Sequence, residues 1–303
     1  DYGTVFARTA YELNGAKAPN GNRDGETNLG DLITDALIWG ARQNGEAVDA
    51  AVTNGGGIRA TIKAGDITKK DINTVLPFGN TLSIVKVTGA ELLEALEAST
   101  YCTPDALGGF PQVSGIAFTV DTTKTYDAGS LYPDSTYHAP KSINRVTIQS
   151  VGGKPFDAKA VYTIATNDFM AAGGDTYYAF KTASANYDIG VPMDEVLMDY
   201  ITTELKGVVG DTYAKPQGRI TVVKAAAPAE EPAKPVTPPA VKPAEPAGDG
   251  GETSYTVVSG DCLWNISYHF YGSGAKFTRI ASANGLKPPY LINIGQVLVI
   301  PAA

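Results

Sequence analysis

Apolar positions recur at helical and strand periods through the first 224 residues. Within 27–45, leucine and isoleucine return every three or four positions, which predicts a helix capped by Asn28 and stopped at Gly45. The same criteria predict two further helices and four strands: helices over 90–100 and 193–205, and strands over 81–89, 141–153, 162–167 and 218–223. Helices and strands that alternate in this way predict a mixed α/β domain built in layers.

The remaining residues divide into a spacer and a small module. Segment 225–253 contains seven prolines and no aromatic residue, so it cannot bury enough apolar surface to fold and is predicted to be an extended linker. Periodic apolar positions resume in 254–303. They predict a β-α-α-β unit with a strand over 254–260, helices over 262–272 and 276–286, and a strand over 296–301.

Composition fits a globular protein, with 43% hydrophobic and 18% charged residues. No apolar run reaches the length of about 18 residues that a transmembrane helix needs, so none is predicted. Because the first residue is Asp1 and no signal peptide precedes it, we expect the chain to be processed or cut from a longer one. The net charge of −8 makes duplex nucleic acid a poor partner, and a phosphate group would need a local pocket.

Cysteine and histidine usage restricts the chemistry further. Cys102 and Cys262 lie far apart, match no metal pattern and indicate no disulfide framework, so both are interpreted as small, partly buried thiols. His138 and His269 are the two histidines, and neither lies in a ligand spacing such as HxH or HExxH. Because a dinuclear hydrolase site usually takes several histidines with carboxylates, we expect no such site in this chain alone.

A triple-glycine loop is the first candidate for ligand binding. Residues 52–59 read VTNGGGIR, and Gly56 and Gly57 follow an apolar run that predicts a strand end. Free backbone amides at such an end suit an anion, and the planar guanidinium of Arg59 could hold phosphate oxygens. Arg23, just before the first predicted helix, could add a second positive charge; each arginine taken alone could equally be a solvated surface charge.

Two further loops place aromatic and polar side chains beside glycine. Segment 75–81 contains Phe78 and Asn80, and segment 167–175 contains Phe169 and Asp175. Each phenylalanine could also be a buried loop anchor. Together with the arginines, these residues suit a nucleotide: rings stack on the base, amides read its edge, a carboxylate accepts from ribose hydroxyls, and arginines hold phosphate.

Five stretches of the larger segment follow one another in the order of a known family. They read RDGETNLGDLITDA, TNGGGIR, VLPFGNTLSIVKVTGAELLEALE, GGFPQVSG and NDFMAAGGDTYY. Residues 1–224 therefore resemble the C-terminal, substrate-binding domain of the 5′-nucleotidase family of secreted and surface nucleotide hydrolases. The resemblance implies a layered α/β/β/α-type domain.

The resemblance also implies roles for individual residues. Phe78 and Phe169 match the pair that sandwiches the base, Asp175 matches the aspartate on the ribose hydroxyls, and Arg23 and Arg59 match phosphate ligands. The other positions that the resemblance places at the substrate are Asn54, Gly56, Gly57, Asn80 and Gly108.

The family's catalytic half is an N-terminal metallophosphatase domain with two divalent metals, and this sequence does not contain it. We therefore expect the chain to bind nucleotide, to need no cofactor of its own and to be inactive alone. Pro19 stands where some family members have an arginine, four residues before Arg23, which leaves the diphosphate preference open. Two alternatives also remain open: a 2′,3′-cyclic phosphodiesterase or nucleotide-sugar hydrolase of the same superfamily, and a non-enzymatic wall-anchored nucleotide-binding protein.

Residues 254–301 resemble a LysM domain, through YTVVSGD, the ANGL turn and the final GQVLVIP. LysM modules bind N-acetylglucosamine glycans such as peptidoglycan, which implies an extracytoplasmic location for the chain, in the cell wall or periplasm or secreted. The resemblance places the glycan groove between two loops: Gly260, Asp261, Cys262 and Leu263 in the first, and Pro288, Pro289, Tyr290, Leu291 and Ile292 in the second. Trp264, Phe270 and Ile280 are interpreted as core residues of this small unit.

Overall fold

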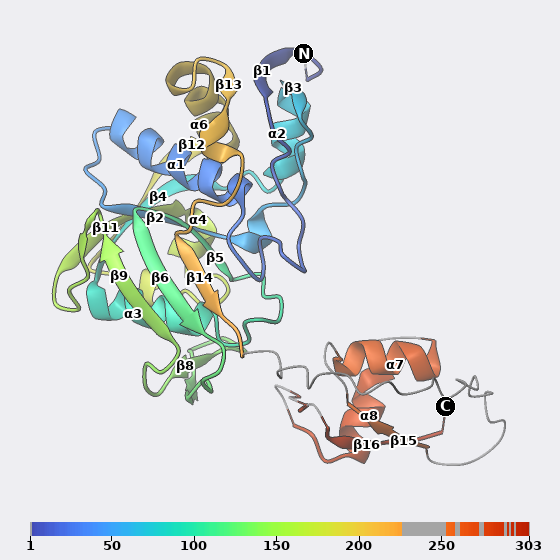
Figure 1. The fold of residues 1–303 in the computed structure, drawn as a ribbon. Helices are drawn as coiled ribbons and strands as arrows, with labels where there is room; N and C mark the ends of the chain where they lie inside the picture. Colours follow the sequence, from blue (N-terminus) through green and yellow to red (C-terminus); the bar gives the residue numbers. More distant parts are fainter. Residues whose placement is uncertain are drawn as a thin grey trace, which may run out of the picture. The chain divides into compact units, whose positions relative to one another are not determined.

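A computed structural model describes residues 2–225, 253–257, 261–272, 276–287, 290, 292–293 and 295–302. The chain divides into two compact units, Asp1–Ala229 and Glu230–Ala303. Figure 1 shows the larger unit with helices on both sides of its strands. Most of the segment predicted as a linker, 226–252, lies outside the described residues.

A five-stranded mixed sheet forms the centre of the larger unit. Its strands, in spatial order, are β12 (Ala185–Pro192), β4 (Thr81–Thr88), β11 (Val161–Asn167), β2 (Ala50–Asn54) and β5 (Pro111–Ser114). Strands β2 and β11 run parallel, whereas every other neighbouring pair is antiparallel. The C-terminal ends of β2 and β11 therefore lie at the same sheet edge as the N-terminal ends of β4 and β5.

Both faces of this sheet are buried. Along β4, Leu82 and Ile84 enter a core formed with helices α1 (Asn28–Gln43) and α6 (Met193–Asp199), whereas Val85 and Val87 enter a second core formed with α3 (Gly89–Ser99). The alternation follows from the pleat, which turns successive side chains to opposite faces. The fold is thus a mixed, layered α/β domain, as predicted from the alternation of helices and strands.

The helices of the larger unit are α1 (Asn28–Gln43), α2 (Lys69–Val75), α3 (Gly89–Ser99), α4 (Asp168–Ala171), α5 (Tyr178–Lys181) and α6 (Met193–Asp199). The prediction that Asn28 caps α1 is wrong, because the side chain of Thr27 accepts from the Gly30 amide instead. The Asn28 amide group donates to the carbonyls of Glu12 and Tyr213, which ties the helix start to two distant segments.

Smaller sheets complete the unit. One contains β10 (Lys154–Pro155), β9 (Val146–Val151), β6 (Ile116–Asp121) and β14 (Ile220–Val223); another contains β13 (Val208–Val209), β1 (Val5–Thr9) and β3 (Gly65–Thr68); a hairpin contains β7 (Ala128–Leu131) and β8 (His138–Pro140). The strand predicted over 141–153 is confirmed only in its central part. The helix predicted over 193–205 continues past α6 as a π-helical turn, Tyr200–Glu204.

A buried charge cluster joins the last strand to α1. The Arg219 guanidinium, next to β14, donates to Asp35 Oδ2 at 2.9 Å, and its Nη1 lies 3.6 Å from Asp31 Oδ1. Burial raises the pKa of the Asp31 carboxyl to about 8. Arg219 opposes this shift only partly, because its closer ion pair, at 2.8 Å, is with Asp35.

The smaller unit has the predicted β-α-α-β order: β15 (Thr253–Thr256), α7 (Leu263–Tyr271), α8 (Phe277–Ala283) and β16 (Val297–Ile300). The two strands pair antiparallel, and β15 begins at Thr253, inside the segment predicted as linker. Ile280 is fully buried and Phe270 packs against the same core, which confirms their interpretation as core residues. The side chain of Trp264 lies outside the described residues. None of the described helices combines the length and apolar character that a membrane span needs.

Candidate functional site

Four loops meet at the shared edge of the five-stranded sheet. The glycine turn 55–57 follows β2, helix α4 follows β11, loop 77–80 precedes β4, and loop 107–110 precedes β5. Their convergence follows directly from the strand order and directions, although the loops are far apart in sequence. This edge therefore holds almost all of the chemistry that the sequence singled out.

A cleft of 340 Å³ lies among these loops. Its lining consists of Arg23, Asn54, Gly56, Gly57, Phe78, Asn80, Gly108, Phe169 and Asp175. The tenth predicted residue, Arg59, lies at the rim, where its guanidinium carbon is 5.6 Å from the centroid of the Phe78 ring. Its Nη1 also donates to the carbonyl of Gly56 at 3.3 Å. The structure thus brings all ten predicted positions together, without itself showing what they bind.

The two phenylalanine rings are unusually open to solvent. Phe78 is 60% exposed and Phe169 is 43% exposed, so neither is the buried loop anchor that was considered as an alternative. Large exposed apolar side chains that border a cleft are typical of a binding surface rather than of a core. Gly174 sits directly under the Phe169 ring, since a Cβ there would lie 2.5 Å from Cζ of that ring.

Glycine is needed in the turn 55–57 for a physical reason that differs from the one predicted. The amides of Gly55 and Gly56 are not free for an anion, because they donate to the carbonyls of Phe110 and Gly108 at 2.7 Å each. A Cβ at Gly55 would lie 1.8 Å from the carbonyl oxygen of Asn22, and one at Gly56 would lie 2.9 Å from that of Gly108. Glycine is needed here so that two loops can pack backbone against backbone.

An amide relay connects the ends of β11 and β2 to the aspartate. Asn167 donates from Nδ2 to Asn54 Oδ1 at 3.0 Å, and Asn54 donates from Nδ2 to Asp175 Oδ2 at 3.4 Å. Asn167 also caps α4 by accepting from the Met170 amide at 2.8 Å. The relay fixes the orientation of Asp175, which has a positive φ of 52°.

Asp168 holds the two aromatic loops in place. Its Oδ1 accepts from the side chain of Asn80 at 2.7 Å and from the backbone amides of Thr81 and Phe169 at 3.3 and 2.9 Å. The loop that carries Phe78 is therefore bonded to the helix that carries Phe169. Sequence analysis missed both Asn167 and Asp168, although they lie in the NDFMAAGGD stretch, because their role depends on cross-strand distances.

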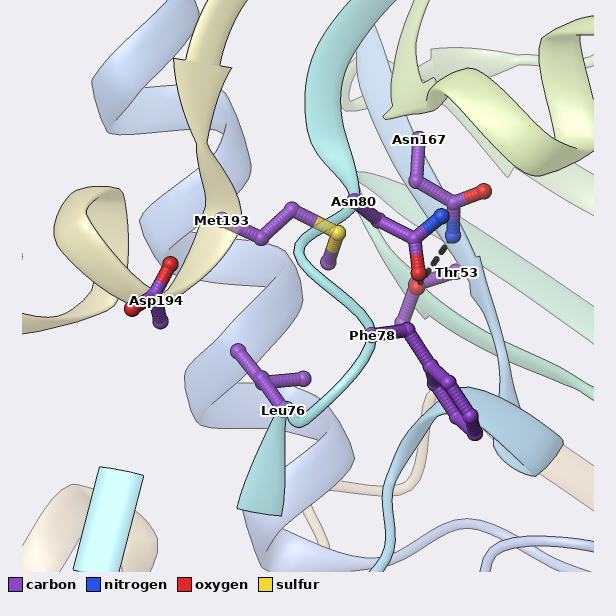
Figure 2. A pocket seen from close by; sticks show the side chains of 8 residues that line it. Thr53, Leu76, Phe78, Asn80, Asn167, Met193 and Asp194 are labelled. Carbon is purple, nitrogen blue, oxygen red and sulfur yellow. Dashed lines mark hydrogen bonds between the residues drawn. The ribbon is translucent and has the colours of Figure 1, made fainter. Parts of the chain in front are cut away.

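A small cavity of 10 Å³ lies next to the cleft, between the Phe78 loop and α6 (Figure 2). It is lined in part by Leu76 and Met193, and at its back Asn167 donates to Thr53 Oγ1 at 3.2 Å. Figure 2 shows the Phe78 ring pointing away from Met193 and Asn167. With room for about one water molecule at most, this cavity is packing space rather than a ligand site.

Electrostatics favour an anion near the arginines. Partial burial and the neighbouring charge of Arg59 lower the pKa of Arg23, while Asp175 opposes the shift. The Nε atom of Arg23 is buried and has no hydrogen-bond partner in the described part of the chain. Burial raises the pKa of Asp175, and the bond from Asn54 and the charge of Arg23 limit that rise. Among the described residues, no group of three or more His, Cys, Asp or Glu is arranged to hold a metal ion.

Comparison with known sequences assigns each unit to a family. Residues 6–182 match the family model described as 5′-nucleotidase, C-terminal domain, and residues 255–301 match the LysM domain model. The chain belongs to the 5′-nucleotidase C-terminal domain family. The second unit is a LysM domain, and it follows the first unit in the sequence.

Two relatives and one solved structure show the extent of the similarity. The trifunctional nucleotide phosphoesterase protein YfkN of Bacillus subtilis is 37% identical over 201 residues, which are 66% of this chain and 13% of the relative. Cell wall protein Lmo0130 of Listeria monocytogenes is 36% identical over 184 residues, 59% of this chain and 21% of that protein. A 5′-nucleotidase precursor from Thermus thermophilus matches with a TM-score of 0.61 and 35% identity, over 74% of this chain and 40% of that one. The chain thus spans a small part of the two curated relatives.

The described residues include only some of the residues predicted to form the glycan groove of the LysM domain. Gly260, Pro288, Pro289 and Leu291 lie outside the described residues. Of the remaining groove candidates, Leu263 is buried in the core, so its side chain is not free for a sugar, and Ile292 packs against the same core. Tyr290 has a positive φ of 55°, and Asp261 accepts from the Tyr255 hydroxyl at 2.7 Å.

Neither cysteine forms a disulfide, and their environments differ. Cys102 is half-buried, and burial raises its pKa to about 11. The interpretation of Cys262 as a partly buried thiol is wrong, because this side chain is exposed.

Proposed function

We propose that this chain is the nucleotide-recognition half of a 5′-nucleotidase-type hydrolase that a LysM domain tethers to peptidoglycan. The observation that carries the proposal is the convergence of two exposed phenylalanines, two arginines and one oriented aspartate at a single 340 Å³ cleft. Family membership supports the same assignment.

Each part of a nucleotide has a matching group in the cleft. The exposed rings of Phe78 and Phe169 offer faces for stacking on the base. Asp175, held by Asn54, accepts hydrogen bonds from the two ribose hydroxyls. Arg23 and Arg59 hold the phosphate through their planar guanidinium groups.

Hydrolysis would need groups that this chain does not supply. The family resemblance assigns two divalent metals to the N-terminal half of the full-length enzyme, where they would activate water and polarise the phosphate. This chain would orient the substrate. It would hold the base and ribose in one orientation and leave the phosphate at the open rim of the cleft, beside the arginines. We therefore expect the chain alone to bind nucleotides without hydrolysing them.

The LysM domain would keep the recognition half at the cell envelope. A module that binds N-acetylglucosamine glycans fits an extracytoplasmic location, and a cell wall protein is among the relatives. The proline-rich segment between the units would allow the nucleotide cleft to sample substrate while the module stays on the glycan.

Isothermal titration calorimetry on the 303-residue chain tests the recognition role. AMP and adenosine should bind, ribose 5-phosphate should bind more weakly, and no phosphate should be released during the titration. Phe169→Ala should weaken AMP binding, whereas Val161→Ala, at an exposed position outside the cleft, should not. Absence of heat with every nucleoside and nucleotide would overturn the proposal.

A broader phosphoester specificity is the competing proposal, since one relative bears the name trifunctional nucleotide phosphoesterase. Base and phosphate preferences of the full-length protein would separate the two. A full-length protein that hydrolyses 2′,3′-cyclic nucleotides faster than AMP would favour the competing proposal.

A further inference from the structure

A second cavity, of 510 Å³, adjoins the nucleotide cleft. The two share Phe169 and Asp175 as lining residues, so they meet at the aspartate assigned above to the ribose. The rest of its wall comes from the turn 132–137 between β7 and β8, the loop 172–174 and helix α5. This cavity is larger than the nucleotide cleft, and none of the ten predicted site residues except those two contributes to it.

Contacts within the protein hold the wall of this second cavity in place. Tyr132 is buried, donates its hydroxyl to Glu94 at 2.8 Å and stacks on Tyr178 with ring centroids 5.2 Å apart. The backbone amide of Tyr132 donates to the carbonyl of Tyr137 at 2.9 Å, which closes the turn. The turn is therefore anchored to helices α3 and α5.

The lining has the chemistry of a site for a ring with polar edges. Tyr132, Tyr137 and Tyr178 supply aromatic surface and two further hydroxyls, while the shared Phe169 supplies another ring. The charged side chains of the lining are Lys181, which is exposed and forms no ion pair within the described part of the chain, the exposed Asp134 in the turn, and the shared Asp175. Aromatic side chains next to a cation suit a nucleobase joined to a phosphodiester.

The orientation of the bound nucleotide, which rests on the proposed function, decides which substituent reaches this cavity. With the 5′-phosphate at Arg23 and Arg59, the ribose hydroxyls face Asp175, where the second cavity begins. A group attached to the 3′-oxygen can enter it, and the free 2′-hydroxyl then remains to donate to Asp175. A group attached to the 5′-phosphate, such as the sugar of a nucleotide sugar, leaves the cleft past the arginines instead.

We propose that the second cavity binds the second nucleoside of a 5′-phosphorylated dinucleotide that is linked through the 3′-oxygen of the first. Tyr137 and Tyr178 contact the second base, and Lys181 supplies positive charge for the linking phosphodiester. The substrate class of the cleft then extends from mononucleotides to the 5′-phosphorylated ends of short oligonucleotides.

Calorimetry with three ligands on the 303-residue chain tests this assignment. The ligands are AMP, the dinucleotide pApA, and diadenosine 5′,5′-diphosphate. In the last compound the two adenosines are joined through their 5′-oxygens and not through a 3′-oxygen. We expect pApA to bind about tenfold more tightly than AMP, and the 5′,5′-linked compound to show no such gain. Tyr137→Ala and Lys181→Ala should each reduce the advantage of pApA and leave AMP affinity unchanged. Tyr187→Ala, a partly exposed tyrosine that lines neither cavity, is the matched control.

The outcomes separate the two proposals. If AMP binds but pApA binds no more tightly, the second site is refuted and the nucleotide cleft stands. If the advantage of pApA survives both variants, the second base lies elsewhere and the second site is again refuted. If neither AMP nor adenosine binds, the recognition role fails, and the dinucleotide site fails with it.

Discussion

The substitution Gly174→Ala tests the base platform without removing an aromatic ring. The new Cβ would lie 2.5 Å from Cζ of Phe169 and 2.6 Å from both Cε atoms, against a normal carbon–carbon contact of about 3.5 Å. Rotation of the ring about its own axis gives no relief, because Cζ lies on that axis. The ring must therefore move by about 1 Å.

The backbone around Gly174 cannot absorb this displacement easily. Its amide donates to the carbonyl of Phe169 at 2.9 Å, and its carbonyl accepts from the Tyr177 amide at 3.2 Å. Base stacking is worth about 1–3 kcal/mol, so we expect Gly174→Ala to weaken AMP binding between about fivefold and one hundredfold. Since Phe169 is 43% exposed, its displacement should change the free energy of unfolding by less than about 1 kcal/mol.

Calorimetry with AMP and urea unfolding measure these two effects on the same variants. Gly210→Ala is the matched control, because a Cβ there meets no atom within 4 Å. Phe169→Ala sets the maximum loss, and the double variant Phe169→Ala/Gly174→Ala should lose no more than Phe169→Ala alone, since both act on one contact. Wild-type affinity in Gly174→Ala, together with a clear loss in Phe169→Ala, would show that the ring position deduced here is wrong.

Three further predictions concern the ribose, the buried charge cluster and the tether. Asp175→Asn, which tolerates the positive φ, should weaken AMP several-fold more than 2′-deoxy-AMP in calorimetry; an equal loss would place the ribose elsewhere. Burial raises the pKa of Asp31 from 3.8 to about 8. Between these two pKa values the folded state binds one more proton than the unfolded state, so the free energy of unfolding falls as the pH rises. Urea unfolding of Asp31→Asn should lack this part of the pH dependence, a slope of at most about 1.4 kcal/mol per pH unit, and an unchanged profile would contradict the shift. Deleting 254–303 should abolish pull-down on purified peptidoglycan while AMP binding persists; retained pull-down would refute the tether.

The periodic parts of the fold could be predicted from sequence because local pattern and tertiary burial agree there. In α1, Leu29, Leu32 and Leu37 recur at helical spacing and all are buried on one face. The helix start was misplaced by one residue because Thr27 and Asn28 are both good capping residues. Contacts with the distant Glu12 and Tyr213 carbonyls decided between them, and no local pattern contains those contacts.

Residue type and position in loops were enough to find the residues that line the cleft, but not the residues that hold them in place. Phe78 and Phe169 stand out because a large aromatic side chain in a loop beside glycine is less typical of a core, and Asp175 follows two glycines in the second of these loops. Asn167 and Asp168 do not stand out, since their importance comes from bonds to Asn54 and Asn80 across the sheet edge. The second cavity was missed entirely: its wall depends on the stacking of two tyrosines 46 positions apart, Tyr132 and Tyr178, which no sequence period indicates.

The bonds within the cleft also determine which recognition steps this half can perform alone. Asn167, Asn54 and Asp175 form a continuous relay, and Asp168 ties the two aromatic loops together through bonds within the protein. A cleft organised in this way needs little rearrangement to accept base and ribose, so their discrimination should be intrinsic to this chain. The arginines differ, because Arg59 lies at the open rim and Arg23 keeps an unpaired Nε. On the proposed function, discrimination by phosphate number should therefore depend on the part of the full-length protein that closes that rim.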